Sequence, residues 1–253
     1  MSSADFAQIL FTEYLQFDPD DPNWFNRDRF VLSAGHESAL MYALLYQIGW
    51  LNKEDIENFR QLKSRTPGHP EVEIPGVEAT TGPLGQGFAM AVGMAVAESM
   101  LREKLTQLSD DISDVFGHYT YVLAGDGDFQ EPIVLGAGSM AGHWGLSRLI
   151  VYYDANNAQI SGKVDRSDST NYAQVFEGFG WHVQEIDGHD HDKIREAIEK
   201  AQVVDRPSLI IGTTIMAKGA ANVEGDHETH GAPLDYDEIS ATKDKLGLPQ
   251  DLF

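Results

Sequence analysis

Hydrophobic residues recur along the chain with two different spacings, which predict an alternation of strands and helices. Short runs rich in β-branched and aromatic residues predict buried strands at Tyr119–Ala124, Leu149–Tyr153, His182–Ile186 and Ser208–Ile215. Apolar residues three or four positions apart predict helices at Pro132–His143, Thr170–Phe179 and Asp190–Val203. This alternation predicts an α/β fold in which a parallel sheet is flanked by helices on both faces.

Helical spacing also dominates the beginning of the chain. It appears in Phe6–Tyr14 and again in Ala39–Ile48, so the first 50 residues are predicted to be mainly helix, interrupted by a connecting turn at Asp18–Pro22. A long buried helix is predicted over Gly85–Leu105, entered through the glycine-rich loop Thr80–Gly87. Because a helix N-terminus presents free N–H groups and partial positive charge, this loop is a candidate anion site.

Length and composition limit the possibilities further. The 253 residues predict one α/β domain spanning 1–253. The 40 acidic and 18 basic residues give a formal charge of −22, which argues against nucleic-acid or anionic-lipid binding. A salt-rich environment and a basic partner subunit would each explain this excess.

The chain contains no cysteine, which excludes disulfides, thiolate nucleophiles and zinc–thiolate sites. No basic, hydrophobic signal segment opens the sequence, and no apolar stretch reaches the ~18 residues that a membrane span requires. We therefore expect a cytoplasmic location.

Two polar segments follow the central predicted strands. Gly125-Asp126-Gly127 comes after the first and Asp154-Ala155-Asn156-Asn157 after the second. Because the carboxyl ends of parallel strands meet at one rim of a sheet, Asp126 and Asn156 are expected to lie together. Mg²⁺ takes one or two carboxylates with other oxygens and substrate phosphates, so Asp126, Asn156 and a carbonyl at Ala158 would suffice. Gly-Asp-Gly alone is more often a plain turn, but the paired Asn and both strands favour a Mg²⁺–diphosphate site.

Seven of the nine histidines fall into two groups, according to whether they lie in a motif. His36, His69 and His230 lie beside glycine or within motifs, where imidazoles can move protons or bind phosphate. His118, His143, His182 and His191 lie in no motif and are interpreted as structural. His227 and His230 have a spacing that could bind metal on a helix, but the following Gly-Ala-Pro indicates a loop and does not favour a metal site. Asp187–Asp190 is interpreted as a turn that caps the next helix.

At these residues the chain resembles the diphosphate-binding domain of transketolases, thiamine diphosphate enzymes that move two-carbon ketol units between sugar phosphates. Six ordered blocks over nearly the whole length carry the resemblance: Asp28–His36, Thr66–Glu71, Thr80–Gly87, Gly125–Glu131, Tyr153–Asn157 and His230–Leu234. The resemblance implies a role in carbohydrate metabolism through the pentose phosphate pathway.

The resemblance also implies roles for individual residues. Asp126, Asn156 and the Ala158 carbonyl match Mg²⁺ ligands, with Ca²⁺ or Mn²⁺ as substitutes. Contacts to thiamine diphosphate match His36, Gly82, Pro83, Leu84, Gly127, Asn156 and His230. His69 and His230 match histidines at the donor sugar. Glu131 matches a carboxylate that pairs across the dimer interface and couples two active sites.

Transketolases continue into a second domain that holds the cofactor's aminopyrimidine ring and activates it. Its absence here predicts a split transketolase, with a separate pyrimidine-binding subunit and self-association, as in an α₂β₂ assembly. Relatives also carry about thirty residues with a Ser-Gly-His-Pro-like motif before the segment matching Ser3–Phe6. Either the start of this sequence is assigned too late, or donor binding and activity are altered. A transketolase-like subunit acting on a sulfosugar, apulose phosphate or another specialised sugar, and a non-catalytic cofactor-binding subunit, remain alternatives.

Overall fold

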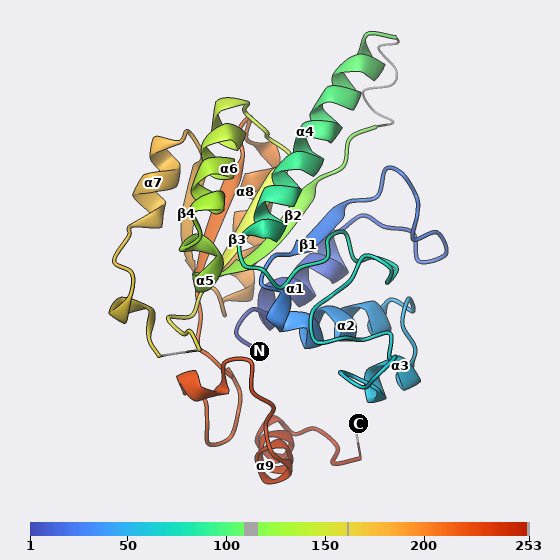
Figure 1. Ribbon diagram of the computed structural model, residues 1–253, viewed down its shortest axis with the longest axis vertical. Helices are drawn as coiled ribbons and strands as arrows, with labels where there is room; N and C mark the ends of the chain where they lie inside the picture. The colour runs from blue at the N-terminus through green and yellow to red at the C-terminus, as the bar shows by residue number, and fades with distance from the viewer. Residues whose placement is uncertain (109–115, 161, 252–253) are drawn as a thin grey trace.

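The computed structural model describes residues 1–108, 116–160 and 162–251. Five strands form one sheet in the order β1-β2-β3-β5-β4, and every neighbouring pair is parallel (Figure 1). The strands are β1 (Arg29–Leu32), β2 (Thr120–Gly125), β3 (Leu149–Ala155), β4 (His182–Asp187) and β5 (Ser208–Thr213). The predicted α/β fold is therefore confirmed.

Successive side chains of the central strands point to opposite faces, which gives the sheet two hydrophobic cores. In β2, Tyr121 and Leu123 belong to one core, while Val122 and Ala124 belong to the other. The same alternation runs through β3, whose residues from Leu149 to Tyr152 are fully buried. Burial on both faces explains why these strands are continuous apolar runs in the sequence.

Helices cover both faces of the sheet (Figure 1). The first core is closed by α1 (Ala4–Ile9), the π-helical turn η1 (Leu10–Tyr14), α2 (Ser38–Gln47) and α8 (His191–Val203). The second is closed by α4 (Gln86–Thr106), α6 (Pro132–His143) and α7 (Tyr172–Gly178). Shorter elements are η2 (Gly35–Glu37), α3 (Lys53–Glu57), α5 (Asp126–Phe129), η4 (Val164–Arg166), η5 (His227–Thr229) and α9 (Tyr236–Leu246).

Two sequence-based predictions need correction. The interpretation of the first 50 residues as mainly helical missed β1, because four residues are too few to show a strand period. Its side chains nevertheless alternate, with Phe30 in one core and Val31 in the other. Strand β5 ends at Thr213 instead of Ile215, because the Thr214 hydroxyl turns to donate to Asp154 and the Ile215 N–H donates to His189.

No helix formed by residues 1–108, 116–160 or 162–251 is long and apolar enough to cross a membrane.

Candidate functional site

A cavity of about 550 Å³ opens where β2 and β3 end. Its lining comes from segments far apart in the sequence. The lining residues are His36, Glu37, Arg60, His69, Gly82, Leu84, Gly125, Asp126, Gly127, Asn156, Ala158, Gln159, Ile160, His230 and Gly231. The structure thus brings together every site residue predicted from the sequence except Pro83 and Glu131.

Asp126 is buried at the start of α5, with 5% of its surface exposed. Its Oδ1 accepts a hydrogen bond from the Tyr153 hydroxyl at 2.6 Å, whereas Oδ2 is buried without a partner among the described residues. Burial raises the pKa of Asp126 to about 6, although the Tyr153 hydroxyl and the N–H groups of Ala158 and Asn157 oppose the shift. Since an unpaired buried carboxylate oxygen is costly, a cation at Oδ2 would satisfy it.

Asn156 is fixed by its own turn and by Asp154. Its Nδ2 donates to Asp154 Oδ2 at 2.8 Å, and its Oδ1 accepts from the Ala158 N–H at 3.0 Å. An amide oxygen has two lone pairs, so Oδ1 can still bind a cation. Asp154 also accepts from the hydroxyl of Ser2 at 2.6 Å and from that of Thr214.

The described residues contain no group of three or more His, Asp or Glu side chains arranged to hold a metal ion. Mg²⁺ does not need such a group, because one carboxylate, neutral oxygens and ligand phosphates complete its shell. The bare oxygen of Asp126, the Asn156 amide and the Ala158 carbonyl therefore suit Mg²⁺.

Glycines allow the backbone to approach closely on the opposite wall. Gly82 has a φ of +141°, and a Cβ there would lie 3.2 Å from the ring of His69. A Cβ on Gly127 would lie 2.8 Å from the side chain of Leu84, which is tighter than real contacts allow. At Gly82 the positive φ favours glycine, and at Gly127 a Cβ would require the Leu84 side chain to move, so the backbone on this wall is well suited to lie close to an anionic ligand.

Asp128 holds this glycine-rich wall together, although the sequence interpretation did not single it out. It is fully buried, and its Oδ1 accepts from the Ser33 hydroxyl at 2.6 Å and from the Gly85 N–H at 2.7 Å. Its Oδ2 accepts from the Gly125 N–H at 3.0 Å. One carboxylate therefore joins the ends of β1 and β2 to the residue that precedes α4.

His36 and His230 face one another, with ring centroids 4.8 Å apart. Burial, followed by the neighbouring His230 and His69, lowers the pKa of His36 to about 4. Burial also lowers the pKa of His230, against the opposing effect of Asp154, and Nδ1 of His230 is buried without a partner within the described chain. Both imidazoles are therefore neutral near pH 7, and each can donate through one nitrogen and accept through the other.

Glu37 and Arg60 were missed by the sequence interpretation, and both line the cavity. Burial and then the Asp154 carboxylate raise the pKa of Glu37 to about 7, while the Ser3 hydroxyl donates to its Oε2 and opposes the shift. Because Glu37 directly follows the predicted site residue His36, its place in the cavity could have been predicted from the sequence. Arg60 has no motif around it, and its left-handed backbone, with φ +61°, is visible only in the structure.

Glu131 and Pro83 lie outside the cavity. Glu131 is an exposed residue at the start of α6, where its N–H donates to the Asp128 carbonyl at 3.0 Å. Pro83 is exposed on the loop before α4. Their predicted roles at an interface and at the cofactor stay predictions.

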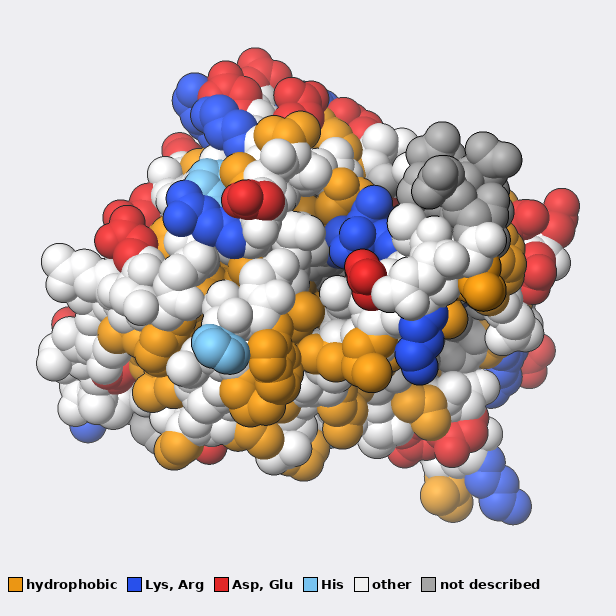
Figure 2. All heavy atoms as spheres, turned by 90° about the horizontal axis from the view of Figure 1, so that it is seen from above, with side chains coloured by type: hydrophobic (Ala, Val, Ile, Leu, Met, Phe, Trp, Pro, Cys, Tyr) orange, Lys and Arg blue, Asp and Glu red, His pale blue; other side chains and the backbone are white. Residues whose placement is uncertain are grey.

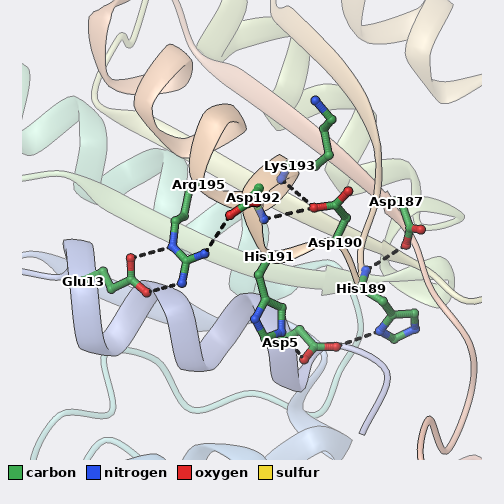
Figure 3. Close-up of polar contacts among 9 residues, drawn as sticks. All are labelled: Asp5, Glu13, Asp187, His189, Asp190, His191, Asp192, Lys193 and Arg195. Atoms are coloured by element: carbon green, nitrogen blue, oxygen red, sulfur yellow. Dashed lines mark hydrogen bonds and ion pairs between the residues drawn. The ribbon is translucent and has the colours of Figure 1, made fainter.

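The turn Asp187–Asp190 has the structural role predicted for it (Figure 3). Asp190 Oδ1 accepts from the N–H groups of Asp192 at 3.0 Å and Lys193 at 3.1 Å, which caps α8. In Figure 3, Asp5 of α1 lies between His189 and His191. Its Oδ2 is 2.7 Å from His189 Nδ1, and its Oδ1 is 2.9 Å from His191 Nε2. Because His189 Nε2 accepts from the Ile215 N–H at 2.9 Å, its proton is on Nδ1 and points to Asp5.

Family models, curated proteins and solved structures all give matches to this chain. The family model described as "Transketolase, thiamine diphosphate binding domain" matches residues 1–253. Transketolase 2 of Escherichia coli (strain K12) is 48% identical over 251 residues, which are 98% of this chain and 37% of that protein. The crystal structure of transketolase from Campylobacter jejuni gives a TM-score of 0.92 at 44% identity, covering 99% of this chain and 39% of that chain. A transketolase from Pichia stipitis in complex with sedoheptulose 7-phosphate gives 0.93 at 40% identity, covering 99% and 37%.

Proposed function

Because the chain belongs to the family of transketolase thiamine diphosphate binding domains, we propose that it holds the diphosphate of thiamine diphosphate through Mg²⁺ and takes part in ketol transfer between ketose and aldose phosphates. The observation that carries this proposal is Asp126 Oδ2, a buried carboxylate oxygen that faces no protein partner in the described cavity. Such an oxygen is stabilised by a cation, and a diphosphate would complete the cation's shell.

Each wall of the cavity has its own task in this proposal. Asp126, Asn156 and the Ala158 carbonyl would bind Mg²⁺. The backbone N–H groups of Gly82, Leu84 and Gly127, which line the cavity, would face the diphosphate, whereas Pro83 has no N–H group to donate. When bound, thiamine diphosphate supplies the carbanion chemistry, and the protein supplies orientation and proton handling.

The histidines are suited to proton handling. His36 and His230 have lowered pKa values and are neutral near pH 7, so each can donate to one oxygen while it accepts from another. His230 lies against His36, and His69 packs over Gly82. We propose that His36 contacts the diphosphate, and that His69 and His230 contact the donor sugar and move protons at its hydroxyl groups.

The chain spans 34–39% of the length of the curated relatives compared with it. We propose that ketol transfer also uses a pyrimidine-binding part that corresponds to the rest of those relatives. Our hypothesis is that a separate pyrimidine-binding subunit supplies it, in an α₂β₂ assembly. Support for the self-association in that assembly comes from an apolar groove of about 550 Å³ between α4 and α6, lined by Ala89, Val92, Gly93, Val96, Ile133, Gly136, Ala137, Met140 and Trp144. Figure 2 shows hydrophobic side chains gathered along the lower side of the view. Glu131 lies next to Ile133 at one end of this groove, which is consistent with an interface role.

Simple assays of cofactor binding and turnover distinguish two alternative functions from the proposed one. A subunit specialised for another sugar would bind the same cofactor and metal but would turn over a different ketose. A non-catalytic subunit would bind the cofactor without turnover. The cavity retains Asp126, Asn156, His36, His69 and His230 together, which favours an active enzyme.

Asp126→Asn tests the proposal, because it removes the charge and keeps the shape. Thiamine diphosphate binding to the chain is measured by titration calorimetry with Mg²⁺ and again with EDTA. We expect wild type to bind only with Mg²⁺, and Asp126→Asn to lose at least about tenfold in affinity. The exposed Asp165→Asn is the matched control and should bind like wild type. Equal binding by wild type and Asp126→Asn would refute the metal assignment.

A further inference from the structure

A second cavity of about 370 Å³ adjoins the first, and six residues line both. These shared residues are His36, Glu37, Arg60, Asn156, His230 and Gly231. The residues assigned above to Mg²⁺ and the diphosphate line the first cavity, and among them only His36 and Asn156 extend to the second. The boundary between the two cavities is therefore where a second ligand would meet the cofactor.

Glu37 stands at this boundary with one oxygen uncommitted. Its Oε2 accepts a hydrogen bond from the hydroxyl of Ser3, which is fully buried, so this bond fixes the Glu37 side chain on its protein side. No hydrogen bond to Oε1 occurs within the described residues. Glu37 is itself only partly buried, because it faces open space on both sides.

The carboxyls around Glu37 differ in how many donors they receive. Asp154 accepts hydrogen bonds from Ser2, Asn156 and Thr214. Glu37, in contrast, accepts from Ser3 alone among the residues that the structure describes. The groups that influence its charge are Asp154 and Asp128, which favour protonation, and the Met1 ammonium and the Ser3 hydroxyl, which oppose it. A carboxyl in this position is a poor neighbour for a diphosphate, since ionisation would place like charges together.

A sugar is the ligand that such a carboxyl suits. In either protonation state it can accept a hydrogen bond from a hydroxyl group, and in the neutral state it can also donate one. Arg60 lines both cavities too, and it is the only lysine or arginine among the described residues that line them. The boundary thus combines a hydroxyl-binding carboxyl, a guanidinium and two neutral imidazoles.

We propose that Glu37 is a further substrate-binding residue, whose free oxygen holds a hydroxyl group of the sugar phosphate at the boundary between the two cavities. This inference rests on the proposed ketol-transfer function and adds to it a contact that the sequence motifs do not assign.

The test uses the full enzyme, with the pyrimidine-binding half present, and sedoheptulose 7-phosphate as the donor. Glu37→Ala should raise KM for the donor about tenfold, since one hydrogen bond to a charged or polarised group is lost. Glu37→Gln should stay near wild type, because the amide keeps one acceptor and one donor at the same place. The exposed Glu73→Ala is the control and should leave KM unchanged.

A second measurement does not depend on turnover. The affinity for sedoheptulose 7-phosphate, measured by calorimetry in protein without thiamine diphosphate, should fall in Glu37→Ala and recover in Glu37→Gln. Affinity for Mg²⁺ and thiamine diphosphate should be the same in all variants, which also shows that they are folded.

The outcomes separate the two proposals. An active wild type whose KM and sugar affinity are unchanged in Glu37→Ala would overturn the role of Glu37 alone. Loss of cofactor affinity in Glu37→Ala would also overturn it, by showing that the residue supports the diphosphate site. A wild type that binds cofactor but neither binds nor converts the sugar phosphate would overturn the proposed function itself.

Discussion

Asp128 is the residue whose removal should most disturb the site without touching a ligand. Its carboxylate accepts from Ser33, Gly85 and Gly125, at 2.6, 2.7 and 3.0 Å. Asp128→Ala would leave all three donors buried and unpaired. Each buried donor left unsatisfied costs about 1 kcal/mol or more.

The summed loss is partly offset, because the Asp128 carboxylate is fully buried, and burial of a charged group is unfavourable and raises its pKa. We therefore expect Asp128→Ala to lower the free energy of unfolding by about 3 kcal/mol. For a chain of this size that corresponds to a fall in Tm of roughly 8 °C. Asp128→Asn keeps one oxygen for two of the three donors and should lose about half as much.

The assay is urea unfolding followed by tryptophan fluorescence, with thiamine diphosphate affinity measured at a temperature where every variant is folded. Affinity should fall in Asp128→Ala, because Gly85 and Gly125 flank the loop and the strand end that we propose face the diphosphate. The exposed Asp165→Asn should change stability by less than about 0.5 kcal/mol. If Asp128→Ala unfolds within about 0.5 kcal/mol of wild type, the reasoning from buried donors is wrong.

Two further predictions concern charge and assembly. The folded-state pKa of Glu37, about 7, exceeds the ordinary 4.5, so its stabilising contribution is present below pH 4.5 and lost as pH rises to 7. In the metal-free protein, the difference in unfolding free energy between wild type and Glu37→Gln should change by up to about 3 kcal/mol between pH 4.5 and 7. This value is an upper limit, because Glu37 is partly exposed. A difference that stays constant with pH would contradict the raised pKa of Glu37. Met140 is half-exposed in the groove between α4 and α6 and should support self-association of the chain. Met140→Glu and Glu131→Ala should therefore each shift the sedimentation profile toward monomer. Profiles identical to that of wild type would count against this interface.

The sequence predicts the central sheet well because β2, β3 and β5 are buried on both faces and are therefore continuous apolar runs. Strand β1 could not be recognised in the same way. It has four residues and begins with Arg29, whose head group reaches the Arg27 and Phe25 carbonyls outside the core. Its place in the sheet follows from pairing with β2, a contact between residues about 90 positions apart that no local pattern contains.

The site shows the same division. Asp126 and Asn156 could be placed together, because both follow strands and parallel strands end at one rim. Arg60 could not be placed at the cavity from the sequence, because no motif surrounds it and only the folded chain brings the segment between α3 and Thr66 to the cavity. In that segment the Arg60 N–H donates to the Thr66 carbonyl at 2.8 Å. Asp128 was visible in the run Gly-Asp-Gly-Asp, yet only the structure shows that its partners come from three separate segments.

The number of donors that each carboxyl receives explains which of them can bind a ligand. Asp128 and Asp154 each accept from three protein donors, so both are structural supports: one holds the glycine-rich wall and the other holds the Asn156 amide. Within the described residues, Asp126 has a buried oxygen without a partner, and Glu37, which lines both cavities, has one oxygen that receives no hydrogen bond. A buried bare oxygen favours a desolvated cation, whereas one beside open space favours a hydroxyl group that arrives with the substrate. In our two proposals, the same chemical group therefore serves as a structural support, a metal ligand or a sugar ligand at one rim, according to how many hydrogen bonds it already receives from the protein.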